Sequence, residues 1–233
     1  MSVQHIRRGF LALLTASLLF PQGSVTAQTT EWRLVRTGAL GEEFVAVAVH
    51  PAEPTRVYAA TGRAVYGSLD GGETWGELFR VPAQVRVRAL AASAAEEPTL
   101  LLATDQGLYG SFDGGRHWKR VFRSAREGAS QCTYVAFHPH QPGTALLGTR
   151  GGLSVSTTQG RRWKVMALPS TARDIRHFAF DPQGMDRLYV VTTQGLFIGS
   201  LGSGRWVKRL GAFDAEDPAV EDSSPDDTAE AAD

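Results

Sequence analysis

One octapeptide, Ser68-Leu69-Asp70-Gly71-Gly72-Glu73-Thr74-Trp75, returns along this chain at a regular interval. Its second copy, Ser111-Phe112-Asp113-Gly114-Gly115-Arg116-His117-Trp118, follows 43 residues later. The five tryptophans stand at positions 32, 75, 118, 163 and 206, so that neighbouring tryptophans are 43, 43, 45 and 43 residues apart. A period in this range predicts a protein built from repeated structural units.

Two further copies of the octapeptide are degenerate. The third, Ser156-Thr157-Thr158-Gln159-Gly160-Arg161-Arg162-Trp163, has lost the aspartate, and the fourth keeps little beyond glycines and Trp206. Other residue types keep the same register, namely Thr61, Thr104, Thr149, Thr192, Gly107, Gly152 and Gly195. Because so many residues recur at equivalent positions of successive periods, the repeat spans most of the chain.

Each period contains four short runs with β character. The runs of the first period are 44–49, 56–61, 64–68 and 75–80, and those of the fourth are 175–180, 187–192, 196–200 and 206–210. They are rich in Val, Phe and Tyr and lack a helical stripe, so they predict strands. Four strands per period of about 43 residues are typical of one blade of a β-propeller.

The sequence therefore predicts an all-β propeller of about four four-stranded blades. Four blades could close into a small ring, or a second chain could complete an eight-bladed ring as a homodimer. The segment Trp32–Arg36 resembles an outer strand that lacks its own blade, and such a strand could pair along a sheet edge.

The octapeptides resemble the Asp-box, also called the bacterial neuraminidase repeat, with the pattern SxDxGxTW. The copy at 68–75 matches it fully, and the copy at 111–118 departs only at His117. The resemblance covers residues 31–210. Together with His50, Pro51 and Pro54, it is similar to the sortilin-like and photosystem assembly-factor-like propellers.

We expect the box residues to be structural. Each aspartate can accept hydrogen bonds from turn N–H groups, the glycines permit positive φ, and the tryptophan packs beneath the hairpin. A calcium loop is disfavoured, because two or three oxygens fall short of the six to eight ligands that calcium takes. The structural set is Ser68, Asp70, Gly72, Thr74, Trp75, Ser111, Asp113, Gly115, Trp118, Ser156, Gly160, Trp163 and Trp206.

The resemblance also raises glycoside hydrolysis, since Asp-box propellers include sialidases and xyloglucan-degrading enzymes. A glycosidase needs two carboxylates flanking a sugar cleft. Acids outside the boxes, such as Glu53 and Asp105, have no evident partner, and no FRIP tetrapeptide occurs. We expect a protein without catalytic residues; a carbohydrate-binding or sialidase-like protein is the alternative.

Cofactor and metal motifs are also missing. The sequence has neither GxGxxG after a strand nor GxxxxGK[ST], so no cofactor is predicted. His138 and His140 flank Pro139, and His50 and Asp181 occupy the position equivalent to His138. We interpret these histidines as turn residues rather than metal ligands. Tyr134 and His177 share a column and are expected to face the central channel or a neighbouring blade.

The N-terminal residues 1–27 are predicted to be a signal peptide. Arg7 and Arg8 precede an apolar stretch over 9–20, and Ala27 ends a small-residue cleavage site. The Arg-Arg pair leaves the twin-arginine route open beside ordinary secretion, and an uncleaved anchor is the alternative. We expect a periplasmic or secreted protein without a stable membrane span after cleavage. Its single cysteine, Cys132, excludes an internal disulfide framework and is expected to be buried.

Residues 28–211 form the predicted propeller, and residues 212–233 form a predicted disordered acidic tail. From Asp214 onward the tail carries nine acidic residues and no basic one. Residues 28–213 hold 22 basic against 15 acidic residues, although the formal charge of the whole chain is zero and gives no sign of nucleic-acid binding.

In a propeller, the blade-to-blade connectors and the turns between second and third strands share one face. The positions of the arginines in this sequence predict that they gather on that face. Such a basic rim suits carboxylate or phosphate partners, and we expect the acidic tail to compete with an acidic partner for it. The alternative is ordinary solvated surface. We therefore expect a non-enzymatic exported propeller that binds a protein partner, such as an assembly or stability factor for an envelope complex. The candidate face consists of Arg36, Arg63, Arg80, Arg123, Arg126, Arg150 and Arg173.

Overall fold

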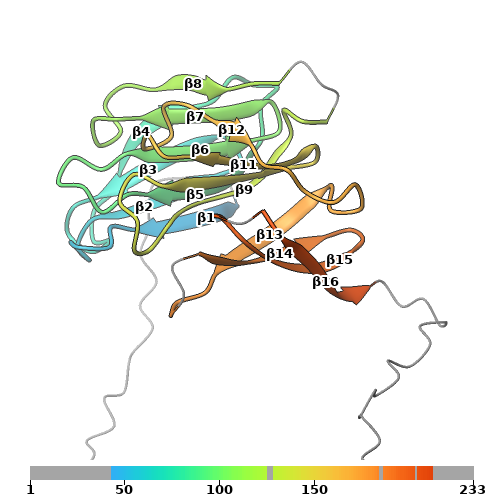
Figure 1. Ribbon diagram of the computed structural model, residues 1–233. Helices are drawn as coiled ribbons and strands as arrows, with labels where there is room; N and C mark the ends of the chain where they lie inside the picture. The colour runs from blue at the N-terminus through green and yellow to red at the C-terminus, as the bar shows by residue number, and fades with distance from the viewer. Residues whose placement is uncertain (1–42, 125–127, 184–185, 203, 212–233) are drawn as a thin grey trace, which may run out of the picture. The chain divides into compact units, whose positions relative to one another are not determined.

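The computed structural model describes residues 43–124, 128–183, 186–202 and 204–211. Within these ranges the chain forms sixteen β-strands and no helix, and the strands make four antiparallel sheets of four strands each (Figure 1). The described part of the chain accordingly offers no helix long and apolar enough to cross a membrane.

The strands of each sheet follow one another in sequence order. The first sheet contains β1 (Phe44–Val49), β2 (Val57–Thr61), β3 (Ala64–Ser68) and β4 (Gly76–Arg80). The second contains β5 (Val87–Ala92), β6 (Leu100–Thr104), β7 (Gly107–Ser111) and β8 (Lys119–Phe122). The third contains β9 (Cys132–Phe137), β10 (Ala145–Thr149), β11 (Gly152–Ser156) and β12 (Lys164–Val165). The fourth contains β13 (Ile175–Phe180), β14 (Arg187–Thr192), β15 (Gly195–Ser200) and β16 (Trp206–Gly211).

These sheets confirm the prediction of four four-stranded units. In the first sheet the outer strand begins at Gly76, one residue after Trp75, whose indole N–H bonds to the turn carbonyl of Gly72. The predicted signal peptide at 1–27, the segment Trp32–Arg36 and the predicted tail at 212–233 lie outside the described residues.

Consecutive sheets pack face to face through three hydrophobic clusters. Side chains alternate between the two faces of a strand, so β5 sends Leu90 and Ala92 into the cluster with the first sheet. Ala89 and Ala91 enter the cluster with the third sheet. The middle strand β6 is buried on both faces, which explains its unbroken apolar run from Leu100 to Ala103.

The first strand of each sheet contains a register irregularity at the same place. In β5 it falls between Val87 and Ala89, and in β13 between Ile175 and His177. A bulge of this kind redirects the extra residue. The extra residues are Arg88 and Arg176, and both are exposed.

Candidate functional site

The aspartate turns, which we define as residues 68–75 and 111–118, are held by hydrogen bonds among their own residues. Ser68 Oγ accepts the N–H of Gly72 at 2.8 Å and donates to Asp70 Oδ1 at 2.7 Å. Asp70 in turn accepts the N–H of Thr74 at 2.9 Å and its hydroxyl at 2.6 Å. The indole N–H of Trp75 closes the turn on the Gly72 carbonyl at 2.8 Å.

The second aspartate turn repeats this geometry although histidine replaces threonine. The N–H of Gly115 donates to Ser111 Oγ at 2.8 Å, and the N–H of His117 donates to Asp113 at 3.0 Å. The His117 ring contacts the other carboxylate oxygen at 2.7 Å. Trp118 donates to the Gly115 carbonyl at 2.9 Å.

The third copy keeps the turn without an acid. Thr158 takes the place of the aspartate, and its hydroxyl accepts the N–H of Arg162 at 2.9 Å. Gly160 still donates to Ser156 Oγ, and Trp163 still donates to the Gly160 carbonyl. The fourth copy differs, because the indole N–H of Trp206 bonds to the carbonyl of Ala167 instead of a turn glycine.

The carboxylates of Asp70 and Asp113 both accept hydrogen bonds within their own turns. The side-chain and backbone hydrogen bonds from Thr74 hold the pKa of Asp70 well below its usual range. For Asp113, the backbone hydrogen bond from His117 does the same. Each aspartate is therefore ionised near neutral pH and has no proton to give to a leaving group there.

The turns also dock on the preceding sheet. A Cβ at Gly115 would lie 2.7 Å from Leu78 of the first sheet, and one at Gly160 would lie 2.7 Å from Leu101 of the second. The ring of Trp118 stacks on Phe79 of the first sheet with centroids 5.0 Å apart. The turn shape that recurs in these copies thus serves packing between neighbouring sheets.

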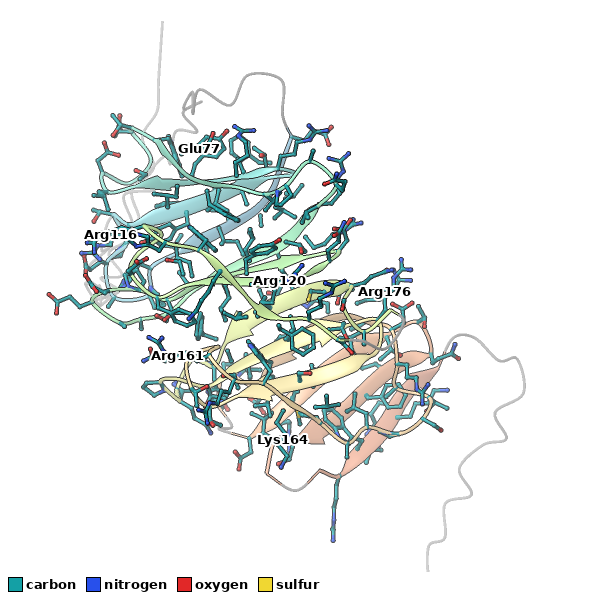
Figure 2. All side chains as sticks on the ribbon, turned by 90° about the horizontal axis from the view of Figure 1, so that it is seen from above. Glu77, Arg116, Arg120, Arg161, Lys164 and Arg176 are labelled. Atoms are coloured by element: carbon teal, nitrogen blue, oxygen red, sulfur yellow. The ribbon has the colours of Figure 1, made fainter. Side chains whose placement is uncertain are left out.

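The opposite ends of the strands form a second surface, which we call the connector face. It consists of the turns between second and third strands, at 62–63, 105–106, 150–151 and 193–194, and the described parts of the links between sheets, at 81–86, 123–124, 128–131 and 166–174. Backbone hydrogen bonds join the two groups: Val81 donates to Arg63 at 2.9 Å, and Asp174 donates to Arg150 at 3.0 Å. In Figure 2, Arg176 lies at this end of the sheets, and Arg116 and Arg161 lie at the aspartate-turn end.

Threonines give the turns of this face a common shape. Thr104 Oγ1 accepts the N–H of Gln106 at 3.2 Å and donates to the carbonyl of Gly107 at 2.6 Å. The three other threonines of this column make the equivalent bonds: Thr61, Thr149 and Thr192. This column of the repeat is explained by turn hydrogen bonding.

The predicted arginines differ in their pairing. Arg80 forms a bidentate ion pair with Glu77, and Arg150 lies 4.0 Å from Asp174. The guanidinium groups of three others are exposed and have no ion-pair partner among the described residues: Arg63, Arg123 and Arg173. Arg36 and Arg126 lie outside the described residues.

A polar groove of about 270 Å³ opens on the connector face beside Arg123. Ser130 Oγ bonds to both the N–H and the carbonyl of Ser124, which holds one wall in place. On the other wall, the carboxylate of Asp105 accepts the backbone N–H of Arg86 at 2.9 Å. The groove is lined by Asp105, Gln106, Arg123, Ser124, Gly128, Ser130 and Gln131.

Sequence reasoning missed three arginines of this face. Arg86 lies in the link between the first two sheets, and Arg88 and Arg176 are the bulge residues of β5 and β13. Simple alternation places Arg88 and Arg176 on an inward sheet face. Their shared column in the repeat is the signal that could have revealed them. Arg176 also donates to Asp174 at 3.3 Å.

The histidines singled out in the sequence hold turns. His50 Nδ1 accepts the N–H groups of Ala52 and Glu53, so Nε2 carries the proton and donates to the carbonyl of Ala95 at 2.7 Å. His138 Nδ1 accepts two turn N–H groups in the same way. No cluster of three or more His, Cys, Asp or Glu residues suited to a metal ion occurs in the described ranges.

Tyr134 and His177 lie together, with ring centroids 3.8 Å apart. Tyr134 packs against the clusters on both sides of the third sheet, whereas Val135 is buried in the cluster between the second and third sheets. Cys132 is buried in the cluster between the second and third sheets.

Comparison with known proteins gives structural matches only. No protein-family model matches the chain, and no curated protein matches it by sequence. A GH74 enzyme from Niastella koreensis superposes with a TM-score of 0.57 at 18% identity, over 71% of this chain and 30% of that one. YCF48 from Cyanidioschyzon merolae gives a TM-score of 0.55 at 18% identity, over 74% of this chain and 58% of that one. YCF48 bound to a D1 peptide gives 0.55 at 15% identity, over 72% of this chain and 55% of that one.

These similarities concern the fold. This chain spans less than two thirds of each of the three solved proteins. In this chain, the four-stranded antiparallel sheets pack against one another in sequence order. The chain therefore has the all-β fold of a β-propeller, with four blades in its described part.

Proposed function

We propose that this chain is an exported, non-enzymatic β-propeller that binds an acidic protein segment on its connector face. The observation that carries the proposal is the set of exposed guanidinium groups without ion-pair partners in the described residues, on Arg63, Arg123 and Arg173. A guanidinium is a planar fork of donors that matches a carboxylate. A segment rich in Asp or Glu would pair with these groups.

A polypeptide fits this surface better than a compact small molecule. The groove beside Arg123 holds about 270 Å³ and is lined by polar residues, and Arg63 and Arg173 lie in other turns and links of the same face. The solved complex of YCF48 with a D1 peptide supports this view, because that propeller of similar fold carries a peptide. An assembly or stability factor for an envelope complex would use such a surface.

The remaining parts of the chain are consistent with this role. We propose that residues 1–27 direct export to the periplasm or beyond, and that the octapeptides are Asp-box repeats. The nine acidic residues from Asp214 onward would compete with the partner for the connector face. Such competition would make binding depend on how densely the partner segment is charged.

Glycan binding or hydrolysis is the second candidate, because a GH74 enzyme shares the fold. Against hydrolysis, the Asp70 and Asp113 oxygens are occupied by turn hydrogen bonds. Incubation with fluorogenic sialosides and β-glucans tests it, and clear turnover would replace the proposal with an enzymatic function. Binding on a glycan array without affinity for acidic peptides would favour a carbohydrate-binding protein.

The direct test measures binding of a fluorescent peptide with the sequence of residues 214–233. Reversing two charges, Arg123→Glu and Arg173→Glu, should weaken binding about tenfold, since exposed ion pairs contribute up to about 1 kcal/mol each. The matched control combines Arg161→Glu with Arg162→Glu, which makes the same change in net charge at the aspartate-turn end. Binding should also fall when salt is raised. Equal affinity for the double variant and the control, or no effect of salt, would refute the proposal.

A further inference from the structure

The first sheet exposes an apolar face that has no neighbour in the described residues. The clusters join the first sheet to the second, the second to the third and the third to the fourth. The side of the first sheet that points away from the second sheet, which we call the rear face, is left open. Its members are Phe44, Val47, Val49, Val57, Ala59, Tyr66 and Trp75.

Equivalent positions in the second sheet are buried, so this face has the residue types of a sheet-to-sheet interface. Val47 pairs with Ala59 as Leu90 pairs with Leu102 in the second sheet, 43 residues later. Leu90 and Ala92 are 7% and 9% exposed because they pack on the first sheet. Their equivalents Val47 and Val49 are 66% and 51% exposed. A groove of about 490 Å³, lined by apolar residues, runs along this face.

Among the described residues, nothing covers the complementary side of the fourth sheet, which we call the front face. It includes Ala179, Tyr189, Val191, Leu196 and Ile198. Val191 and Leu196 pair as Ala103 and Leu108 do in the second sheet. Ala103 and Leu108 are fully buried against the third sheet, whereas Val191 is 44% exposed.

From these two faces we infer that copies of this chain associate head to tail, with the rear face of one copy packed on the front face of another. The contact repeats one that the chain already makes three times between its own sheets. The charged side chains of these faces lie toward their margins: Glu77 stands opposite Tyr66 on the rear face, and Arg187 lies two residues before Tyr189 on the front face. His177, which pairs with Val191, has its ring against Tyr134 of the third sheet. Two copies that meet at both ends would place eight blades in one ring, within the usual range of four to eight. This inference concerns other residues than the connector face and does not depend on the proposed function.

The experiment measures molar mass by light scattering over a range of concentrations, on the purified protein as the producing cell processes it. We expect about twice the mass of a single chain. Val47→Glu and Val191→Glu should each give a monomer, because a carboxylate is costly to desolvate in an apolar interface. Val165→Glu, at an apolar position of β12 that is 64% exposed, is the matched control and should keep the wild-type mass.

Mixing the two variants provides the decisive measurement. Val47→Glu retains its front face and Val191→Glu retains its rear face, so a 1:1 mixture should form a mixed dimer although neither variant associates alone. Larger assemblies with the same dependence on both substitutions would also support the interface. A wild-type monomer at every concentration would overturn it, because another occupant would then cover the rear face. A dimer abolished only by Val47→Glu, or a mixture that stays monomeric, would also overturn it. Unchanged far-UV circular dichroism verifies that both variants fold.

Discussion

Trp75 and Trp118 offer a matched pair for measuring what one sheet-to-sheet contact contributes to stability. They occupy the same place in the two aspartate turns, both are partly buried, and both indoles donate to a turn glycine, at 2.8 and 2.9 Å. Only Trp118 stacks on a ring of the preceding sheet, where it lies nearly parallel to Phe79 at an angle of 14°. Trp75 lines the open groove of the rear face.

The expected magnitudes follow from these contacts. Either Trp→Ala substitution loses one indole hydrogen bond, which contributes about 1 kcal/mol. Trp118→Ala also loses a stacked aromatic pair, about 1 kcal/mol, and exposes the apolar ring surface that the pair covers, about 1 kcal/mol more. We expect Trp118→Ala to lower the free energy of unfolding by about 3 kcal/mol, and Trp75→Ala by about 1 kcal/mol.

Urea unfolding followed by far-UV circular dichroism measures both effects. All proteins should carry Val191→Glu, which keeps the rear face free of a second copy. Trp163→Ala should behave like Trp118→Ala, because the Trp163 ring meets Phe122 of the preceding sheet edge to face at 6.4 Å. If Trp75→Ala costs as much as Trp118→Ala, then the tryptophan stabilises its own turn rather than the contact between sheets, and the packing argument is wrong.

Three further predictions test the turns and the core. Gly160 has φ of +82° and faces Leu101, whereas Gly71 has φ of +75° and faces open space. In the same unfolding assay, Gly160→Ala should therefore lower the free energy of unfolding by about 3 kcal/mol and Gly71→Ala by about 1 kcal/mol. Equal losses would contradict the clash with Leu101. The lowered pKa values of Asp70 and Asp113 mean that the unfolded chain binds more protons below its ordinary carboxyl pKa of about 3.9. Stability should therefore fall as the pH drops from about 4, and the variant D70N/D113N should show a shallower fall; parallel curves would count against the turn hydrogen bonds as the cause. Burial raises the pKa of Cys132 to about 12, so iodoacetamide at pH 8 should modify the native protein roughly 100-fold more slowly than the urea-unfolded chain, and similar rates would show that this thiol is accessible.

The chemistry of the aspartate turns could be predicted from sequence because all of it is local. Asp70 bonds to Thr74 and Ser68, and Trp75 bonds to Gly72, so every partner lies within four residues. The same holds for Thr104 and its turn. A motif with internal partners needs no knowledge of the rest of the fold.

The connector face was only partly predictable. Topology indicates which turns and links share an end of the sheets, and this places Arg63, Arg123 and Arg173. It does not reveal that Arg150, in the turn between β10 and β11, lies near Asp174, which belongs to the link between the third and fourth sheets. Nor does alternation identify Arg88 and Arg176, because a bulge breaks the period of two on which that reasoning depends.

The amino-acid sequence alone determines that this chain is a series of similar four-stranded sheets with self-contained turns. The 43-residue period is visible in the recurring residues, and the hydrogen bonds of each turn join residues that are close in sequence. Tertiary structure decides which copies of a repeated position become core and which stay exposed. Val47 and Leu90 hold equivalent positions in their strands, yet only Leu90 has a sheet against it. Burial depends on what packs against a residue from elsewhere in the chain, and no local pattern contains that information.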